Sequence, residues 1–283
     1  MSAILIDGKV VSGTVKARAA EAALALREQG VTPCLAVILV GDDAASAVYV
    51  SNKEKACAAC NIESRAFVLP GSTTQEELLE LIDKLNADES VHGILCQMPV
   101  PKHIDPTAVI HAIHPLKDVD AFHPENTGRI LAGTPRFAPC TPAGVMELLA
   151  AYDIDPAGKH CVIIGRSDIV GKPMALLLLQ KHGTVTICHS KTPDLAAMTR
   201  QADIVVAAIG KPKFVKADML KPGAVVIDVG INRDENGKLC GDVDPAAAEV
   251  ASYLTPVPGG CGPMTVAMLM DNTIRAAKLQ SGK

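Results

Sequence analysis

The sequence contains few aromatic residues and no strongly charged run. Its 283 residues include no Trp, three Tyr and four Phe. Proteins that bind single-stranded nucleic acid commonly stack the bases on aromatic side chains, so this function is disfavoured. Lys and Arg number 27 against 31 Asp and Glu, which gives a formal net charge of −4. This balance argues against a surface built to bind phosphate backbones.

The sequence also lacks long apolar runs and a disulfide pattern. Its longest apolar stretches, such as 34–40 and 174–179, fall far short of the roughly 18 residues that a spanning helix needs. The opening residues, MSAILIDGKVV, have no basic segment and do not read as a signal peptide. Nine irregularly spaced Cys in a chain of this size indicate reduced thiols. We therefore expect a cytoplasmic protein.

Aliphatic residues dominate what is present, since hydrophobic residues make up 48% of the chain. Short β-branched runs alternate with longer periodic segments, which predicts strands followed by helices. The expected strands are 35–40, 63–69, 93–97, 161–164, 184–188, 204–208 and 225–229. The expected helices are 44–60, 74–86 (opened by the cap signals Ser72 to Thr74), 141–151, 171–181, 193–201 and 265–279. Strands without polar alternation indicate a parallel sheet covered on both faces, so the fold class is α/β.

A boundary between two domains is expected near Pro139. Residues 118–142 are rich in Pro, Gly, His and Asn and show no sustained period, so they form either a linker or a functional loop. We predict one domain over 1–138 and another over 139–264. The helix 141–151 is expected to bridge the halves, and the Gly/Pro-rich run 256–263 to form a second crossing point.

The clearest local motif is a strand, a glycine turn that begins at Gly165-Arg166-Ser167, and a helix that begins at Gly171. Free N–H groups and the helix dipole at such a turn favour phosphate. The match to the dinucleotide fingerprint is imperfect, because Ser167 replaces the second Gly and Gly171 comes one residue late. An ordinary turn therefore remains the alternative.

The end of the next strand bears on the choice of nucleotide. NAD sites commonly place an acid there to bind the ribose 2′-hydroxyl. Here the strand 184–188 is followed by His189-Ser190-Lys191-Thr192, which contains no acid. Ser190, Lys191 and Arg166 are able to donate hydrogen bonds to a 2′-phosphate. The sequence favours NADP over NAD, with a merely solvated strand end as the alternative.

A second group of polar residues lies in the first half. Tyr49 and Lys53 are four residues apart on a predicted helix and share a face, whereas Lys55 points elsewhere. A Lys beside a low-dielectric site can act as acid or base, although most helical Lys residues are solvated. Gln97 ends the strand 93–97, where α/β folds place ligands, or it caps a turn. Asp118 and Asp120 likewise either bind a polar heterocycle or cap a turn.

Other candidates are weaker. Cys57 and Cys60 have a redox or metal spacing, but they lie late in a helix without a second pair, which favours structural Cys. His111 and His114 share a predicted helical face with no third ligand apparent. We predict no metal site, and no Gly-x-Ser-x-Gly elbow supports a serine hydrolase.

Taken together, six segments resemble the bifunctional methylenetetrahydrofolate dehydrogenase/cyclohydrolase family of the FolD type over essentially the whole chain. They follow one another in family order: Tyr49–Lys55, Gly93–Pro99, Lys117–Phe122, Gly165–Pro173, Cys188–Thr192 and Thr255–Thr265. Each motif is moderately specific, and the ordered set is very specific.

The resemblance implies a folate domain and a Rossmann-like NADP domain that flank a cleft, with the C-terminal helix 265–283 returning to the first domain. It implies a homodimer formed through the NADP domains. The implied reactions are NADP-dependent oxidation of 5,10-methylenetetrahydrofolate to the 5,10-methenyl cation and hydrolysis of that cation to 10-formyltetrahydrofolate. These reactions belong to one-carbon metabolism and supply purine and amino-acid biosynthesis.

The resemblance also assigns residues. Lys53 would be the catalytic acid/base, Gln97 would tune it, Asp120 would hold the pteridine and Tyr49 would stack on the aminobenzoyl ring. The remaining folate contacts would be Cys96, Met98, Pro258, Gly259, Gly260, Cys261 and Gly262, the glycines allowing a flat ligand to approach the backbone. The NADP contacts would be Gly165, Arg166, Ser167, Ser190 and Ile231.

Two positions depart from the family pattern, because Ala121 stands where Gly is usual and Cys261 replaces an aliphatic residue. An alternative enzyme reading is an NADP-dependent dehydrogenase of another small substrate, such as a shikimate-type hydroxy acid. It leaves Tyr49, Lys53 and Gln97 unexplained. A non-catalytic NADP-binding regulator would have no need of a proton-transferring Lys.

Overall fold

The chain forms two compact units. The computed structural model describes residues 2–41 and 44–283, without the side chains of residues 44–49. The first 12 residues and Pro139–Thr265 form one unit, here called the six-stranded unit. Gly13–Ala138 and Val266–Lys283 form the other, here called the three-stranded unit.

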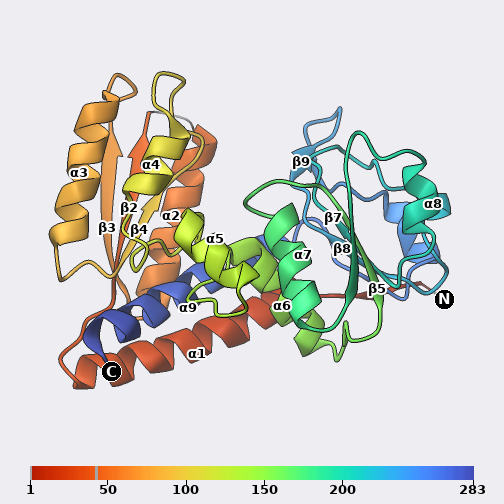
Figure 1. Ribbon diagram of the computed structural model, residues 1–283, viewed down its shortest axis with the longest axis horizontal. Coiled ribbons are helices and arrows are strands. Elements are labelled where there is room, and N and C mark those ends of the chain that lie inside the picture. The colour runs from red at the N-terminus through yellow and green to blue at the C-terminus, as the bar shows by residue number, and fades with distance from the viewer. Residues whose placement is uncertain (1, 42–43) are drawn as a thin grey trace. The chain divides into compact units, whose positions relative to one another are not determined.

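The six-stranded unit is built on a wholly parallel sheet with the order β1-β11-β8-β7-β5-β6 (Figure 1). In that order the strands are Ile4–Leu5, Tyr253–Leu254, Val225–Asp228, Ile204–Ala207, His160–Ile164 and Thr184–Cys188. The chain runs from β5 outward to the edge strand β6 and then returns to β7 on the other side of β5. This reversal is the topology in which parallel sheets bind nucleotides at the carboxyl ends of their strands.

Both faces of this sheet are covered, which explains why β7 and β8 are buried along their whole length. Helices α6 (Cys140–Ala151) and α7 (Gly171–Gln180) pack together, and α7 lies against β5 and β6. The core on the other face includes Val162, Val205 and Val226. The elements that supply the rest of that face and its edge are α8 (Leu195–Thr199), the 3₁₀ turns η1 (Ala217–Met219) and η2 (Pro245–Glu249), and the hairpin of β9 (Asn232–Arg233) and β10 (Leu239–Cys240).

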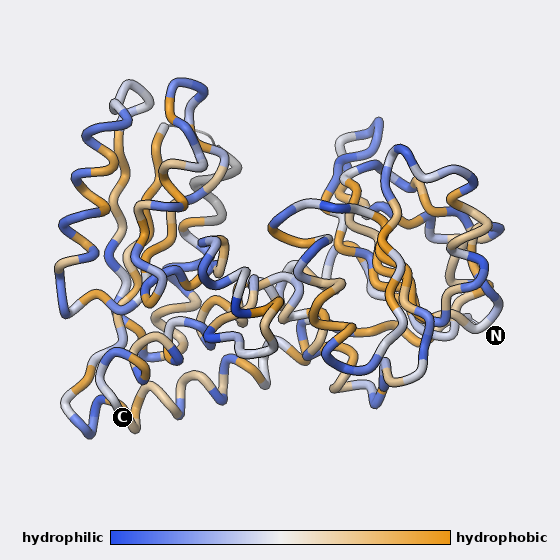
Figure 2. The backbone as a smooth tube through the Cα atoms, viewed as in Figure 1, coloured by the Kyte–Doolittle hydropathy of each residue, from blue (hydrophilic) through white to orange (hydrophobic). Residues whose placement is uncertain are grey.

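The three-stranded unit has a parallel sheet in the order β3-β2-β4, formed by Glu63–Leu69, Cys34–Val40 and Gly93–Cys96. The central strand β2 is buried throughout because helices cover both of its faces. Helices α3 (Gln75–Ala87) and α4 (Pro106–Ala112) form a core with β2, and α2 (Ala44–Ala59) packs on β2 and β3. The helices α1 (Gly8–Glu28), α5 (Pro124–Leu131) and α9 (Cys261–Ser281) complete the set. Figure 2 shows the apolar strands and the polar outer turns of these helices.

Sequence patterns located the longer elements well. The predicted start of α3 is confirmed, because Thr74 is its N-cap and forms a capping box with Glu77. Most of the other long strands and helices lie at the predicted places, with ends shifted by a few residues, but the 21-residue helix α1 was not predicted. Helix α8 is shorter than predicted because it begins only after Asp194, whose side chain caps it.

Four predictions require correction. The first 12 residues join the second unit rather than the first, because β1 pairs with β11. The stretch 118–142 contains the helix α5, which His123 caps and Pro124 starts. Helix α6 lies wholly within one unit, whereas α1 and α9 continue from one unit into the other. Helix α9 begins at Cys261 instead of 265, because Pro263 falls in its first turn, where a missing N–H costs nothing.

Among the described residues, no helix is long and apolar enough to cross a membrane.

Candidate active site

Lys53 and Gln97 are brought together by α2 and by the end of β4. Lys53 Nζ donates a hydrogen bond to Gln97 Oε1 at 2.6 Å. The Gln97 amide is itself fixed, since its Nε2 donates to the Met98 carbonyl at 2.7 Å and its backbone N–H to the Ile38 carbonyl at 2.8 Å. Lys53 is half-buried and Lys55 is exposed, as their spacing predicted. The amide oxygen is therefore held toward a partly desolvated lysine.

The two candidate acids differ in what they do. Asp118 is buried, and its carboxylate accepts hydrogen bonds from the backbone of Phe122 and His123 and from the Asn126 side chain. Burial nevertheless raises the pKa of Asp118. Asp118 is thus the turn-capping acid of the pair. Asp120 is half-buried, and its predicted ligand role stays a prediction.

Asp120 lies near the end of β4, the strand that Gln97 follows. Residues 94 and 118 form a parallel bridge, so the chain that carries Asp120 runs beside the end of that strand. Burial raises the pKa of the Cys96 thiol to about 12, and the charge of Asp120 adds to this rise. Cys96 directly precedes Gln97, and its side chain packs in the hydrophobic core. Its backbone is therefore the part that a ligand can reach.

The side chain of Tyr49 lies outside the described residues, so its predicted stacking role stays a prediction. Its backbone belongs to α2, one turn before Lys53. Met98 is half-buried and is joined to Pro99 by a cis peptide bond.

The predicted nucleotide residues gather at one edge of the six-stranded sheet. Gly165, Ser190 and Ile231 follow β5, β6 and β8, and in a parallel sheet these carboxyl ends share an edge. Gly165 has a φ of +132°, and a Cβ there would lie 2.2 Å from the Ala208 carbonyl oxygen. Only glycine fits this crossing between β5 and β7. The close packing leaves the exposed Arg166 and Ser167 at the rim.

The turn after β5 is ordered by its own polar groups. Ser167 Oγ accepts hydrogen bonds from the N–H groups of Val170 and Gly171 at 3.2 and 3.3 Å. Asp168, whose charge would repel a phosphate, forms an ion pair with Lys172. Arg166 and Ser190 are both exposed. The edge thus presents donors and one neutralised acid, a set that fits a phosphate-bearing nucleotide.

The loop that follows β11 reaches the same edge. Val257 and Pro258 are joined by a cis peptide bond. A Cβ on Gly260 would lie 2.7 Å from the Pro256 carbonyl oxygen, so this glycine is required by backbone packing. A Cβ on Gly262 would have Ile231 Cδ1, at 3.9 Å, as its nearest neighbour. Of these two predicted glycine contacts, Gly262 is therefore the one left open to a ligand.

Cys261 begins α9 from a buried position. Burial raises the pKa of its thiol to about 12, and the nearby Asp228 carboxylate adds to the rise. The thiol is neutral and packs like a small apolar side chain, which makes it a mild replacement for an aliphatic residue.

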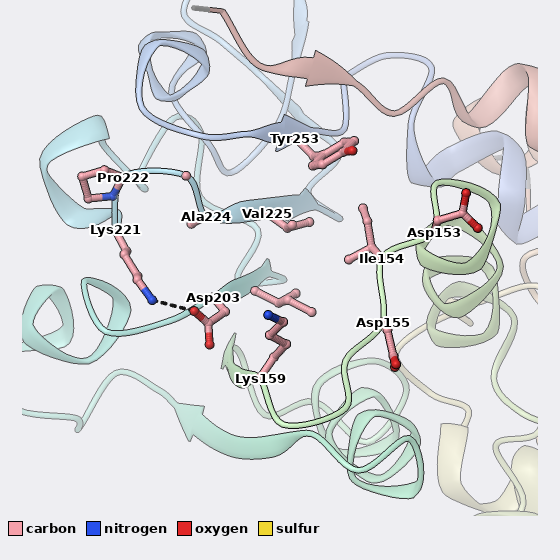
Figure 3. A pocket seen from close by; sticks show the side chains of 12 residues that line it. Asp153, Ile154, Asp155, Lys159, Asp203, Lys221, Pro222, Ala224, Val225 and Tyr253 are labelled. Atoms are coloured by element: carbon pink, nitrogen blue, oxygen red, sulfur yellow. Dashed lines mark hydrogen bonds and ion pairs between the residues drawn. The ribbon is translucent and has the colours of Figure 1, made fainter.

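A cavity of about 430 Å³ lies at the opposite, amino edge of the six-stranded sheet (Figure 3). Lys159, Asp203 and Tyr253 line it where β5, β7 and β11 begin. Figure 3 shows the ion pair of Asp203 with Lys221 at its side. None of the predicted site residues borders this cavity.

The weaker candidates find structural roles. All nine Cys residues are buried free thiols, Cys57 and Cys60 among them. Helix α4 ends at Ala112, so His111 and His114 do not share a helix. No group of three metal-binding side chains occurs in the part of the chain that the structure describes.

The sequence reading missed two acids at the nucleotide edge. Asp228 ends β8 and Asp242 follows β10, and their exposed fractions are 4% and 0%. The available signal was an acid at the end of an otherwise apolar strand, followed shortly by a glycine.

A parallel sheet with a glycine turn at its switch point defines a dinucleotide-binding domain, and the three-stranded unit of the same chain carries a lysine–glutamine pair. Comparison with known proteins agrees. A family model described as "Tetrahydrofolate dehydrogenase/cyclohydrolase, catalytic domain" matches residues 6–120. The corresponding "NAD(P)-binding domain" model matches residues 139–281. The chain belongs to the tetrahydrofolate dehydrogenase/cyclohydrolase family.

Individual relatives are similar over their whole length. The "Bifunctional protein FolD" of Acetivibrio thermocellus is 58% identical over 282 residues, which is 99% of each chain. The crystal structure of the bifunctional enzyme FolD from Campylobacter jejuni has a TM-score of 0.96 at 51% identity, covering 98% of this chain and 99% of that one. The Trypanosoma brucei FolD structure, complexed with NADP cofactor and inhibitor, has a TM-score of 0.94 at 40% identity over all of both chains.

Proposed function

We propose that this protein is a bifunctional one-carbon folate enzyme. It oxidises 5,10-methylenetetrahydrofolate with NADP to give 5,10-methenyltetrahydrofolate and NADPH. It then adds water to the methenyl cation to give 10-formyltetrahydrofolate and a proton. Family membership supports the reaction class. The observation that carries the proposal is the hydrogen bond from Lys53 to Gln97, which places a proton-transferring group on a fixed amide.

NADP is the cofactor of this proposal, and when bound it supplies the acceptor for the hydride. Gly165 allows the close turn, Ser167 and Ser190 offer hydroxyl donors, and Arg166 binds the 2′-phosphate. Ile231 contacts the nucleotide by its exposed side chain. The lack of an acid in the turn after β6 supports NADP over NAD.

The oxidation needs positioning rather than a strong base, because the folate nitrogen lone pair drives hydride loss. Asp120 holds the pteridine, and Tyr49 stacks on the aminobenzoyl ring. The further folate contacts are Cys96, Met98, Pro258, Gly259, Gly260, Cys261 and Gly262.

The hydrolysis requires proton transfer, which is the role of Lys53. Neutral Lys53 takes a proton from the attacking water, and protonated Lys53 returns one to the ring nitrogen that leaves. Gln97 orients Nζ and, being uncharged, does not hold the proton on it.

We also propose a compartment, an oligomeric state and a metabolic role for the enzyme. Nine buried free thiols support a reducing compartment such as the cytoplasm. A homodimer through the six-stranded units is supported by β6, an edge strand on which Ile187 is 39% exposed. The 10-formyl product serves one-carbon metabolism, including purine and amino-acid biosynthesis.

The test is an absorbance assay with methylenetetrahydrofolate and either NADP or NAD. We expect the methenyl band to rise with NADP and then to decay as the cation is hydrolysed. Absence of a rise with either nucleotide would reject the oxidation. A rise followed only by the enzyme-free rate of decay would reject the hydrolysis.

A further inference from the structure

Two buried carboxylates collect an unusual number of hydrogen bonds at the nucleotide edge. Asp228 accepts from the N–H groups of Gly230, Asp242 and Val243, each at 2.9 Å. Asp242 accepts four hydrogen bonds, from the N–H groups of residues 209, 210 and 211 and from Asn232 Nδ2, at 2.7 to 3.1 Å. A carboxylate is suited to this task because it accepts at both oxygens and donates from neither.

These bonds enclose Ile231. The residue before it, Gly230, is bonded to Asp228, and the residue after it, Asn232, is bonded to Asp242. The Ile231 side chain is itself 54% exposed, so its position depends on its neighbours in the chain rather than on burial. The backbone of residues 229–232 is thereby fixed on both sides of an exposed apolar group.

Glycines permit the close approach of backbone and carboxylate. A Cβ on Gly230 would lie 2.4 Å from Asp242 Oδ1. A Cβ on Gly241 would lie 1.8 Å from Asp228 Oδ2. No L-amino acid with a side chain fits either place, so both segments pack directly on the acids.

The same acids reach the other loops of this edge. The Asp228 backbone N–H donates to Thr255 Oγ1 at 2.7 Å, and Thr255 begins the loop that leads to Gly262 at the start of α9. Ile231 Cδ1 is the nearest neighbour of a Cβ placed on Gly262. Asp242 fixes residues 209–211, which follow β7. The two side chains thus connect the segments after β7, β8 and β10, and the Asp228 backbone adds a link to Thr255 after β11.

We propose that Asp228 and Asp242 are positioning residues for hydride transfer, which act by fixing Ile231 at the cofactor. This inference rests on the proposed function, which places Ile231 against NADP. Neither acid touches the reacting atoms. Their effect falls on the oxidation, because positioning supplies most of that step, whereas the hydrolysis depends on Lys53 in the other unit.

Asn232→Ala is the first test, because it removes one bond to Asp242 and leaves both buried acids in place. Asp242→Asn is the second, and it puts an amide donor among converging N–H groups. We expect each to lower the dehydrogenase kcat roughly tenfold or more, with NADP affinity by calorimetry changed much less. Hydrolysis of supplied methenyltetrahydrofolate, measured without nucleotide, stays within about twofold of the parent.

A structural role alone would not change the isotope effect. We therefore expect the primary deuterium isotope effect, measured with substrate deuterated at the transferred position, to rise in Asn232→Ala. Asp244→Asn is the matched control, because that carboxylate accepts from Lys216 and Ala246 and from none of the three loops. It should leave both activities and the isotope effect unchanged.

The parent enzyme is assayed first, so a failure of the proposed function appears as absent activity in the parent. The positioning role is overturned if an active parent yields an Asn232→Ala variant with an unchanged dehydrogenase kcat. It is equally overturned if both activities fall in parallel in that variant with an unchanged isotope effect. Should Asp242→Asn fail to fold, Asn232→Ala decides alone.

Discussion

Lys53 Nζ and Gln97 Oε1 lie 2.6 Å apart, and the orientation of the Gln97 amide allows only its oxygen to face the lysine. Its nitrogen is already committed to the Met98 carbonyl at 2.7 Å. Gln97 therefore accepts a hydrogen bond from either protonation state of Lys53 without adding charge. Such a partner orients a proton-transferring group while leaving the proton free to move.

Replacement of Lys53 by Met should abolish hydrolysis while the fold and NADP binding persist. Loss of a general acid–base group lowers the rate by about 10² to 10⁴. The measurement is the decay of methenyltetrahydrofolate absorbance, with calorimetry for NADP. The matched control is Lys55→Met, which removes an exposed lysine from the same helix. Full 10-formyltetrahydrofolate production in Lys53→Met would contradict the assigned mechanism.

Gln97→Glu should move the pH profile of hydrolysis upward. A carboxylate 2.6 Å from Nζ would hold the proton on Lys53 to higher pH, so less of the neutral base would be present near pH 7. The initial rate of methenyl decay between pH 6 and 9 measures the shift, on a scale of about one pH unit per 1.4 kcal/mol. If the rate of hydrolysis falls at every pH and the profile does not shift, Gln97 acts only by positioning Lys53.

Arg166→Ala should raise the KM for NADP far more than the KM for NAD. A charge-assisted hydrogen bond of about 1.5 to 3 kcal/mol corresponds to roughly a tenfold to hundredfold change in binding. Steady-state kinetics with each nucleotide measure the two values. Arg200→Ala is the control, because this exposed arginine of the same unit donates to the Asp218 carbonyl. Equal changes for NADP and NAD would remove the 2′-phosphate role.

Ala121→Gly should leave the protein as stable as the parent or stabilise it by up to about 1 kcal/mol. Ala121 has a φ of +59°, in the left-handed region that favours glycine, and it follows the proposed pteridine ligand Asp120. Relief of this strain offsets the lost buried methyl group. Ala36→Gly, in the fully buried β2, is the control and should lose roughly 1 to 2 kcal/mol. Urea unfolding measures both, and similar losses would show that Ala121 is unstrained.

The stability contributed by Asp228 should decrease as the pH rises. Burial raises the pKa of Asp228 to about 6 from 3.8, with a smaller contribution from Asp242, while three backbone N–H groups oppose the rise. The folded state therefore binds the proton more tightly than the unfolded chain. The associated stability is present below about pH 4 and is lost as the pH passes 6, an effect of about 2 to 3 kcal/mol.

The Asp228→Asn variant cannot bind a proton at this position. Comparing its stability with that of the parent therefore isolates the contribution of the Asp228 proton. The free energy of unfolding of the variant minus that of the parent should become more positive from pH 4 to 7. For Asp203→Asn the same difference in unfolding free energy should become more negative as the pH rises, because the hydrogen bond from Lys221 lowers the pKa of Asp203. The stability from Asp203 is present above pH 4 and is lost as the pH falls below it. A difference for Asp228→Asn that is constant with pH would contradict the buried-acid assignment.

Much of the fold could be predicted because strands such as β2 and β7 are apolar throughout and helix α3 begins at a clear cap, Thr74. The two-residue strands β1 and β11 could not, since each is too short to show a period and their mutual pairing spans some 250 residues. Helix α5 was hidden among Pro, Gly and His because only eight residues carry its pattern.

The candidate site, like the fold, could be predicted only in part from the sequence. The motifs placed Lys53 and Gln97 on separate elements and only the family resemblance linked them, whereas the structure shows the hydrogen bond between them. Residue type and spacing alone did not separate Asp118 from Asp120; the resemblance singled out Asp120, and the structure shows Asp118 to be the buried acid that caps the turn. Asp228 and Asp242 were missed because most of their partners are backbone N–H groups that only the fold brings together, so an acid near a glycine is a weak signal by itself.

Neither unit is a continuous piece of the chain, and this affects how the protein is made. β1 must wait for β11, some 250 residues later, before its hydrogen bonds can form. The three-stranded unit must wait for α9, whose Asn272 donates to the carbonyls of Val119 and Ala138. On the ribosome both halves thus remain incomplete until nearly all of the chain has emerged. The six-stranded sheet therefore stays unfinished until β11 has been synthesised, and we expect the nascent chain to need chaperones during that time.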